Sequence, residues 1–218
     1  GPPGAVFKHQ WLHEVMPKAK VLANKSQFNK LELVPGARVG ILAAGLAASY
    51  SKEALNRLQL KEKVSFLKLG FIYPLPDLLI QNLLEDLEEL LIVEEGDPVI
   101  ETAVRSLAKE IAPDVKIYGK SYNPVFKPYG EINTDLVTKA IAQMLKIRLR
   151  EDEKEAVRKN LRALVTPRSS TLCAGCSHLG SYSALRQALK KFQGTHIING
   201  DIGCYEQGGY GIFSARVN

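Results

Sequence analysis

LLIVEEGDPVIETAVRSLAKEI, residues 90–111, is the stretch of sequence that best indicates how this chain folds. The apolar run at residues 90–94 predicts a buried strand, and Gly96 predicts the turn after it. Pro98 stands where a helix begins, because its missing N–H costs nothing there. The inward face of this helix is expected to contain Val99, Ala103, Val104, Leu107 and Ile111. Such strand–turn–helix units are typical of a parallel sheet.

The same alternation of short apolar runs and longer amphipathic runs extends over residues 38–147. Residues 38–45, 64–70 and 115–119 predict three further strands. Helices are expected between them, since the apolar residues there recur with helical spacing. The sequence therefore predicts the α/β class, with a mainly parallel sheet.

Each expected helix has its own start signal and buried stripe. Ser49 or Ser51 is expected to cap the first, which runs through Leu58 with Ala54 and Leu55 inward. A helix starting at Pro76 carries the stripe Leu79, Leu83, Leu84 and Leu87. Asn133 or Thr134 is expected to cap the last, with a face made of Leu136, Val137, Ala140, Ile141, Met144 and Leu145.

Changes in composition divide the chain into four expected parts. Residues 1–35 have the character of a tail of a preceding domain, and residues 36–147 form the α/β domain. Residues 148–168 are a charged linker broken by Pro167. Residues 169–218 are expected to start a second, incomplete α/β domain. It would contain a helix with Tyr182, Leu185 and Leu189 inward and a strand at residues 196–199.

Composition and charge exclude several classes of protein. Of the 218 residues, 45% are hydrophobic and 24% are charged, as in ordinary globular domains. The net charge is +6, but bases and acids alternate in RLREDEKEAVRKNLR, residues 148–162, so no nucleic-acid partner is expected. No apolar run approaches the length of a membrane span. Three cysteines without secretory context indicate a reducing, cytoplasmic location.

The three cysteines are the first candidate site. Cys173 and Cys176 form a C-x-x-C pair, and Cys204 lies in a Gly-rich stretch. Thiolates at this spacing suit one edge of an iron–sulfur cluster or of a zinc site, to which His178 would add a fourth ligand. Small packed thiols explain the pattern equally well. Thioredoxin-like redox chemistry is disfavoured, since no strand leads directly into the motif.

Two further groups of residues are candidates because they follow expected strands. In GDIGCY, residues 200–205, the glycines would let the backbone approach a cofactor, and Asp201 would ligate Mg²⁺ or simply form a turn. Glu94, Glu95 and Asp97 lie at the carboxyl end of another strand. Carboxylates there serve acid–base chemistry or cap the next helix, and we expect the capping role.

Several motifs resemble one family in the family's own order. LCAGCSHLGSYSAL at residues 172–185 and INGDIGCY at residues 198–205 resemble the start of the thiamine-diphosphate domain of indolepyruvate ferredoxin oxidoreductase large subunits. GILAAGLAASYSKEAL, LKLGFIYPLP, LIVEEGDPVIE and YGEINTDLV resemble the transketolase-C-terminal-like domain before it. Ala174 replaces a usual proline, and Leu179 replaces a basic residue. The resemblance implies that the chain is an internal piece of a longer enzyme.

The resemblance also implies a reaction and its participants. The intact enzyme would decarboxylate an indolepyruvate-like 2-oxoacid oxidatively to its acyl-CoA, using thiamine diphosphate, Mg²⁺ and a [4Fe–4S] cluster. A second subunit, ferredoxin and coenzyme A would be its partners, and this chain alone would be inactive. Cys173, Cys176 and Cys204 look like three cluster ligands. The implied cofactor-facing residues are Cys176, His178, Gly200, Asp201, Ile202, Gly203, Cys204 and Tyr205.

Two other classes of function remain open. One is a non-catalytic, truncated paralogue that acts only as a subunit-interaction domain. The other is a small zinc protein with three Cys ligands and one His ligand, which would use Cys173, Cys176, Cys204 and His178.

Overall fold

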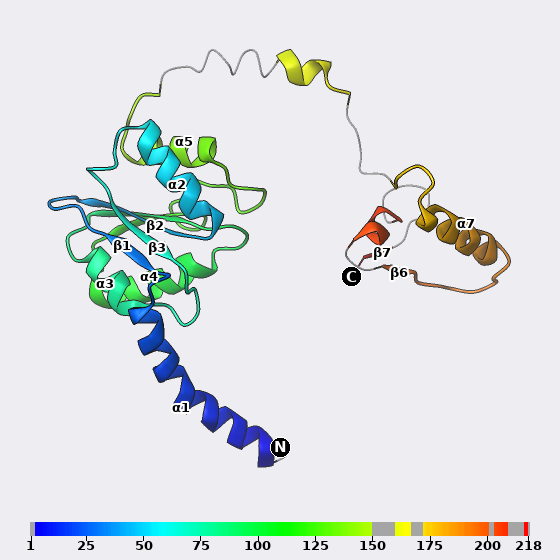
Figure 1. Ribbon diagram of the computed structural model, residues 1–218, viewed down its shortest axis with the longest axis horizontal. Helices are drawn as coiled ribbons and strands as arrows, with labels where there is room; N and C mark the ends of the chain where they lie inside the picture. Colours follow the sequence, from blue (N-terminus) through cyan, green and yellow to red (C-terminus); the bar gives the residue numbers. More distant parts are fainter. Residues whose placement is uncertain (1–2, 150–159, 167–171, 201–202, 209–215, 218) are drawn as a thin grey trace. The chain divides into compact units, whose positions relative to one another are not determined.

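The computed structural model describes residues 3–149, 160–166, 172–200, 203–208 and 216–217 (Figure 1). The chain divides into two units, Gly1–Arg150 and Glu151–Asn218. Much of the expected charged linker, residues 150–159 and 167–168, lies outside the described residues, as do Asp201 and Ile202.

The first unit is built on a five-stranded sheet in the order β1-β3-β2-β4-β5. Its central strand β2 (Val39–Ala44) lies parallel to both β3 (Ser65–Leu69) and β4 (Glu89–Val93). On the far side, β5 (Lys116–Tyr118) lies parallel to β4. All four expected strands are therefore present, and the prediction of a mainly parallel α/β sheet is confirmed.

Two helical layers cover the sheet, one on each face (Figure 1). Helices α2 (Leu46–Arg57) and α5 (Thr134–Met144) pack on one face, and α3 (Asp77–Leu84) and α4 (Val99–Ile111) pack on the other. Alternate residues of β2 separate these layers, since Ile41 belongs to one core and Leu42 to the other. After β2 the chain forms β3 on one side of β2, and it then forms β4 on the other side of β2. The strand order therefore reverses between β2 and β4.

The segment expected to be a tail is packed on the first unit. Helix α1 (Pro3–Lys25) leads to β1 (Lys30–Glu32), which pairs antiparallel with β3 as the edge strand. The buried Asn29 side chain donates to the carbonyl of Ala23 and accepts from the N–H groups of Gly70 and Phe71. The sheet therefore begins before residue 36, because these side-chain bonds and the strand pairing join it to the preceding residues.

The helix starts differ in part from those expected. Helix α2 begins at Leu46, not at Ser49 or Ser51. Gly45, with φ 59°, turns the chain directly from β2 into this helix. Ser51 is inside the helix, where its hydroxyl donates to the carbonyl of Ala47 at 2.7 Å. The expected cap of α5 is confirmed at Asn133, whose side chain accepts from the N–H of Leu136.

The inward face of α4 is rotated relative to the prediction. Its buried residues are Ile100, Glu101, Val104 and Ala108. Val99, Ala103 and Ile111 are exposed, and Leu107 is half-buried, so only part of the expected face is correct. The error has a physical cause: apolar spacing alone never places a glutamate in a core, whereas Glu101 is fully buried here.

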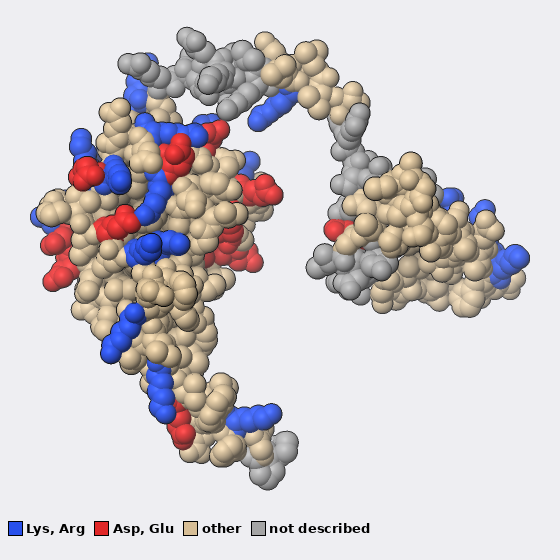
Figure 2. Space-filling view, in the orientation of Figure 1, with Lys and Arg blue, Asp and Glu red and all other residues tan. Residues whose placement is uncertain are grey.

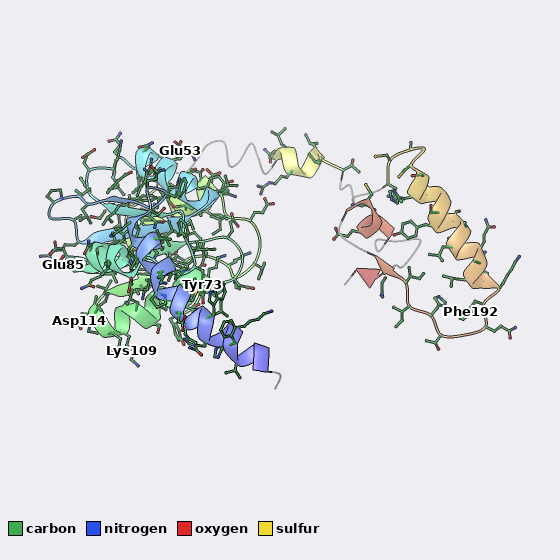
Figure 3. All side chains as sticks on the ribbon, turned by 60° about the horizontal axis from the view of Figure 1, so that its bottom comes forward. Glu53, Tyr73, Glu85, Lys109, Asp114 and Phe192 are labelled. Carbon is green, nitrogen blue, oxygen red and sulfur yellow. The ribbon has the colours of Figure 1, made fainter. Side chains whose placement is uncertain are left out.

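The second unit contains helix α7 (Ser177–Lys190), two short strands and a 3-10 helix, η1 (Cys204–Gly208). Strand β6 (Asn199–Gly200) pairs parallel with β7 (Arg216–Val217), so the strand expected at residues 196–199 begins only at Asn199. Tyr182 is buried as expected, while Leu189 is half-buried and Leu185 is exposed. Phe192, just beyond α7 in Figure 3, packs edge-on against His196.

Within the described part of the chain, the helices are too short or too polar to cross a bilayer. On the face of the first unit seen in Figure 2, Lys and Arg side chains are interspersed with Asp and Glu. Neither sign of charge dominates that face.

Candidate functional site

The loops that follow the parallel strands carry the carboxylates singled out from the sequence. Glu94, directly after β4, accepts from the N–H groups of Ile100 and Glu101 at 2.8 Å each. These donors belong to the first turn of α4, so the expected capping role is confirmed for Glu94. Burial raises the pKa of Glu94, while the two N–H donors and the charge of Lys120 act in the opposite direction. Glu95 accepts more weakly from the N–H of Ile132, at 3.3 Å.

Sequence reasoning missed Glu101, the most buried charged side chain described in this unit. Its carboxylate accepts from the backbone N–H of Lys120 at 2.6 Å and from that of Ser121 at 3.2 Å. It also forms an ion pair with Arg105, one helical turn later, at 2.8 Å. The β5–α5 loop is therefore fastened to α4 by one carboxylate. The sequence signal was Gly119, next to Lys120, because any side chain there would meet Glu101.

Lys120 completes this charged cluster. Its side chain is buried and its ammonium donates to the backbone carbonyl of Gly96, in the β4–α4 loop. Arg105 also donates to the carbonyl of Ile117, in β5. The cluster therefore joins the loops after two neighbouring strands. The charged groups of the cluster bond to one another and to the backbone, so we interpret the cluster as structural.

The C-x-x-C motif forms a turn at the start of α7. The N–H of Cys176 donates to the carbonyl of Cys173 at 3.1 Å, and Cys176 is the residue that precedes the first helical residue. Its thiol lies 3.3 Å from Nδ1 of His178, and both side chains are half-buried. The structure thus brings Cys176 and His178 into contact, and their cofactor-facing role stays a prediction.

Cys204 begins η1, which packs against α7 and both short strands. Cys173 and Cys204 are exposed. Among the residues that the structure describes, no three His, Cys, Asp or Glu side chains are grouped closely enough to hold a metal ion. Cys173, Cys176, Cys204 and His178 are thus not gathered into one metal site here. The cluster and zinc ligand roles stay predictions.

The Gly-rich loop is described only in part. Gly200 ends β6, and Gly203 has a φ of 128°, a conformation that favours glycine. Asp201 and Ile202 lie outside the described residues, and Tyr205 falls within η1. The positive φ of Gly203 agrees with a turn at this point. It does not test whether the loop faces a cofactor.

Fold and site together define the class of protein: a parallel α/β domain followed by a second unit with a cysteine turn at a helix start. The family model described as "Indolepyruvate oxidoreductase domain" matches residues 30–171, more than half of the chain. The chain belongs to the indolepyruvate oxidoreductase family. The matched region starts at β1, in agreement with its place in the sheet.

The curated relatives carry one name. The "Indolepyruvate oxidoreductase subunit IorA" of Pyrococcus abyssi is 37% identical over 92% of this chain and 30% of the relative. The protein of the same name from Methanothermobacter thermautotrophicus is 33% identical over 95% of the chain and 33% of the relative. The chain therefore spans about a third of the length of these relatives.

Solved structures give weaker similarities. A split-gene transketolase, described as an inactive β4 tetramer, is 18% identical over 55% of this chain and 42% of its own, with a TM-score of 0.43. The 2-oxoglutarate:ferredoxin oxidoreductase from Magnetococcus marinus is 17% identical over 66% of this chain and 23% of its own, with a TM-score of 0.40. Scores at this level carry no argument about function.

Proposed function

We propose that this chain is part of a 2-oxoacid:ferredoxin oxidoreductase that acts on indolepyruvate or a similar 2-oxoacid. The reaction would be oxidative decarboxylation to the acyl-CoA, with electrons passed through iron–sulfur centres to ferredoxin. The family match carries this proposal, supported by relatives that are all named as an indolepyruvate oxidoreductase subunit. These relatives are each named as a subunit, and this supports the proposal that a second subunit is a partner of the intact protein.

Within that enzyme, the first unit would be a transketolase-C-terminal-like linking domain. Large exposed apolar side chains follow β2, β3 and β5: Leu46 at the start of α2, and Tyr73 and Tyr122 in the loops after β3 and β5. Apolar side chains gathered at the surface often mark contacts with other protein parts. This supports the linking role. A pure subunit-interaction domain remains the second candidate on the same observation.

The second unit would supply one wall of a pocket for thiamine diphosphate and Mg²⁺. The cofactor, when bound, supplies the carbanion chemistry, and the protein supplies placement. The contact between Cys176 and His178 and the turn at Gly203 support a shaped surface here. The residues proposed to line it are Cys176, His178, Gly200, Asp201, Ile202, Gly203, Cys204 and Tyr205.

Catalysis would require more of the enzyme than these 218 residues, since the chain spans about a third of its relatives. The test is reduction of ferredoxin or viologen by the full-length protein with its second subunit, in the presence of indolepyruvate, coenzyme A, thiamine diphosphate and Mg²⁺. We expect thiamine-dependent reduction by the assembly and none by the 218 residues alone. An assembly that forms but reduces nothing would favour the interaction domain.

The three cysteines of this chain are free, and this supports the proposal that the protein acts in a reducing cytoplasm.

A further inference from the structure

Two histidines on α1 form a close pair that has no part in the proposed function. His9 and His13 are one helical turn apart, and their Nε2 atoms are separated by 3.2 Å. Their ring centroids lie 4.6 Å apart, with an interplanar angle of 75°. Both side chains are exposed. Residues at this spacing share one face of a helix, so the backbone holds the two imidazoles side by side.

The separation of the two nitrogens matches the bite of a single metal ion. Imidazole nitrogens lie about 2.0–2.1 Å from a transition-metal ion, so two of them at an angle of about 90–110° are about 2.8–3.4 Å apart. The observed 3.2 Å falls in this range. Because both rings are exposed, a small rotation about their side-chain bonds lets both lone pairs point to one position.

The surroundings of the pair indicate that His9 and His13 neither form a salt bridge nor pack in a core within the part of the chain that the structure describes, and that they are free to bind a cation. The positions one turn before the pair on its face are Ala5 and Val6, and those one turn after it are Met16 and Pro17, so this face carries no lysine or arginine within one turn of the pair. The nearest carboxylate in sequence, Glu14, accepts from Gln10 at 3.1 Å. Figure 1 shows the amino-terminal turns of α1 extending away from the sheet and its covering helices, in agreement with the exposure of both histidines.

We propose that His9 and His13 form a two-imidazole site for a divalent late transition-metal ion. Imidazole suits Ni²⁺, Cu²⁺ and Zn²⁺, whereas Mg²⁺ and Ca²⁺ prefer oxygen ligands. Two protein ligands leave the other coordination positions to water. Metal bound across one turn also stabilises that turn, because the ion binds the helical state and not the unfolded one. Both ligands belong to α1, so the proposal uses none of the cysteines and does not depend on the proposed oxidoreductase function.

The test is calorimetric titration of the 218-residue chain with Ni²⁺, after alkylation of its three thiols so that they do not compete. We expect one Ni²⁺ per chain, no binding of Mg²⁺, and slower hydrogen exchange in the amino-terminal half of α1 when Ni²⁺ is present. His9→Gln or His13→Gln should weaken Ni²⁺ binding about tenfold or more, because the second imidazole then no longer acts at high effective concentration.

Two control variants separate this site from ordinary histidine binding. Ala5→His/His9→Gln keeps the number of histidines but places the pair eight positions apart, about 12 Å along the helix, so binding should be lost. His196→Gln removes an exposed histidine of the second unit, and binding should be unchanged. Circular dichroism verifies that each variant is folded. The proposal is wrong if the wild-type chain binds no Ni²⁺, if either single variant binds it normally, or if His196→Gln abolishes binding.

Discussion

Glu101 is the most buried charged residue that the structure describes in the first unit. It is 1% exposed and satisfies two backbone N–H groups as well as Arg105. A buried charge is tolerated only when it is paired and hydrogen-bonded. Removing it takes the acceptor from the buried N–H of Lys120 and from the part-buried N–H of Ser121, and it takes the ion-pair partner from the half-buried Arg105. The chain offers a matched comparison in Glu53 and Arg57, which have the same i, i+4 spacing but are exposed.

Glu101→Ala is expected to lower the free energy of unfolding of the first unit by about 3–5 kcal/mol, as when one partner of a buried ion pair is removed. Glu53→Ala should lower it by less than about 1 kcal/mol, because water already screens the exposed pair. Urea unfolding followed by circular dichroism measures both. Equal losses in the two variants would show that burial does not distinguish these pairs.

Gly119 is the residue that makes room for this carboxylate. A Cβ built there would lie 2.6 Å from the carboxyl carbon of Glu101, and that carboxylate is held by its own hydrogen bonds. Gly119→Ala should therefore cost about 1–3 kcal/mol through overpacking. Gly4→Ala, at an open position in α1, should change stability by less than about 1 kcal/mol. Thermal unfolding of both variants is the measurement, and a neutral Gly119→Ala would mean that Glu101 moves freely.

At the scale of elements, α1 shows how a mostly exposed helix is attached at one end. Lys20 forms an ion pair with Asp77 at 2.6 Å, and Asn24 donates to the same carboxylate at 2.9 Å. Burial acts to raise the pKa of Asp77, but the hydrogen bonds from Lys20 and Asn24 outweigh it and hold that pKa below its usual value. The attachment therefore depends on the ionised carboxylate at the start of α3.

A group with a lowered pKa stabilises the fold above its unfolded pKa, and that contribution is lost as pH falls through the lowered value. Hydrogen exchange in the last turns of α1, around Lys20 and Asn24, should accordingly rise relative to α4 when the pH falls into the acidic range. Asp77→Asn should show the looser attachment already at neutral pH and lose this pH dependence. If the variant and the wild-type chain respond alike to pH, Asp77 does not control the attachment.

The helices also show how far elements follow from sequence. Pro76 and Pro98 mark the starts of α3 and α4 to within one residue, because a proline signal is local. The start of α2 was misplaced, since Ser49 and Ser51 are good caps but the turn at Gly45 comes first. The face of α4 depended on Glu101, whose partners Lys120 and Ser121 come from a distant loop.

At the scale of the molecule, the first unit includes residues that the sequence assigned elsewhere. Strand β1 covers the edge of β3, Leu31 packs against the core beside α3, and Asn29 bonds to the backbone after β3. The family match also starts at residue 30. Residues 29–32 therefore belong to the folded first unit.

Residues 1–150, expressed alone, should unfold cooperatively, whereas residues 36–147 should be markedly less stable or fail to fold. The shorter piece loses β1 and leaves the N–H groups of Gly70 and Phe71 without the Asn29 acceptor. Each lost hydrogen bond costs about 0.5–1.5 kcal/mol, because water replaces the Asn29 acceptor, and the lost strand pairing adds to this. Comparison of the two pieces by urea unfolding is the test. Equal stabilities would mean that residues 1–35 are a dispensable tail.

The sequence by itself determined the four parallel strands, their connecting helices and the family. These follow from local signals: apolar runs, proline and glycine punctuation, and the motifs at residues 172–185 and 198–205. Only the tertiary structure decided the antiparallel edge strand β1, the buried Glu101 clamp and the arrangement of Cys173, Cys176 and Cys204. Each of these depends on partners far away in sequence. The free energy that settles such a position comes from long-range pairing and desolvation, which no local pattern records.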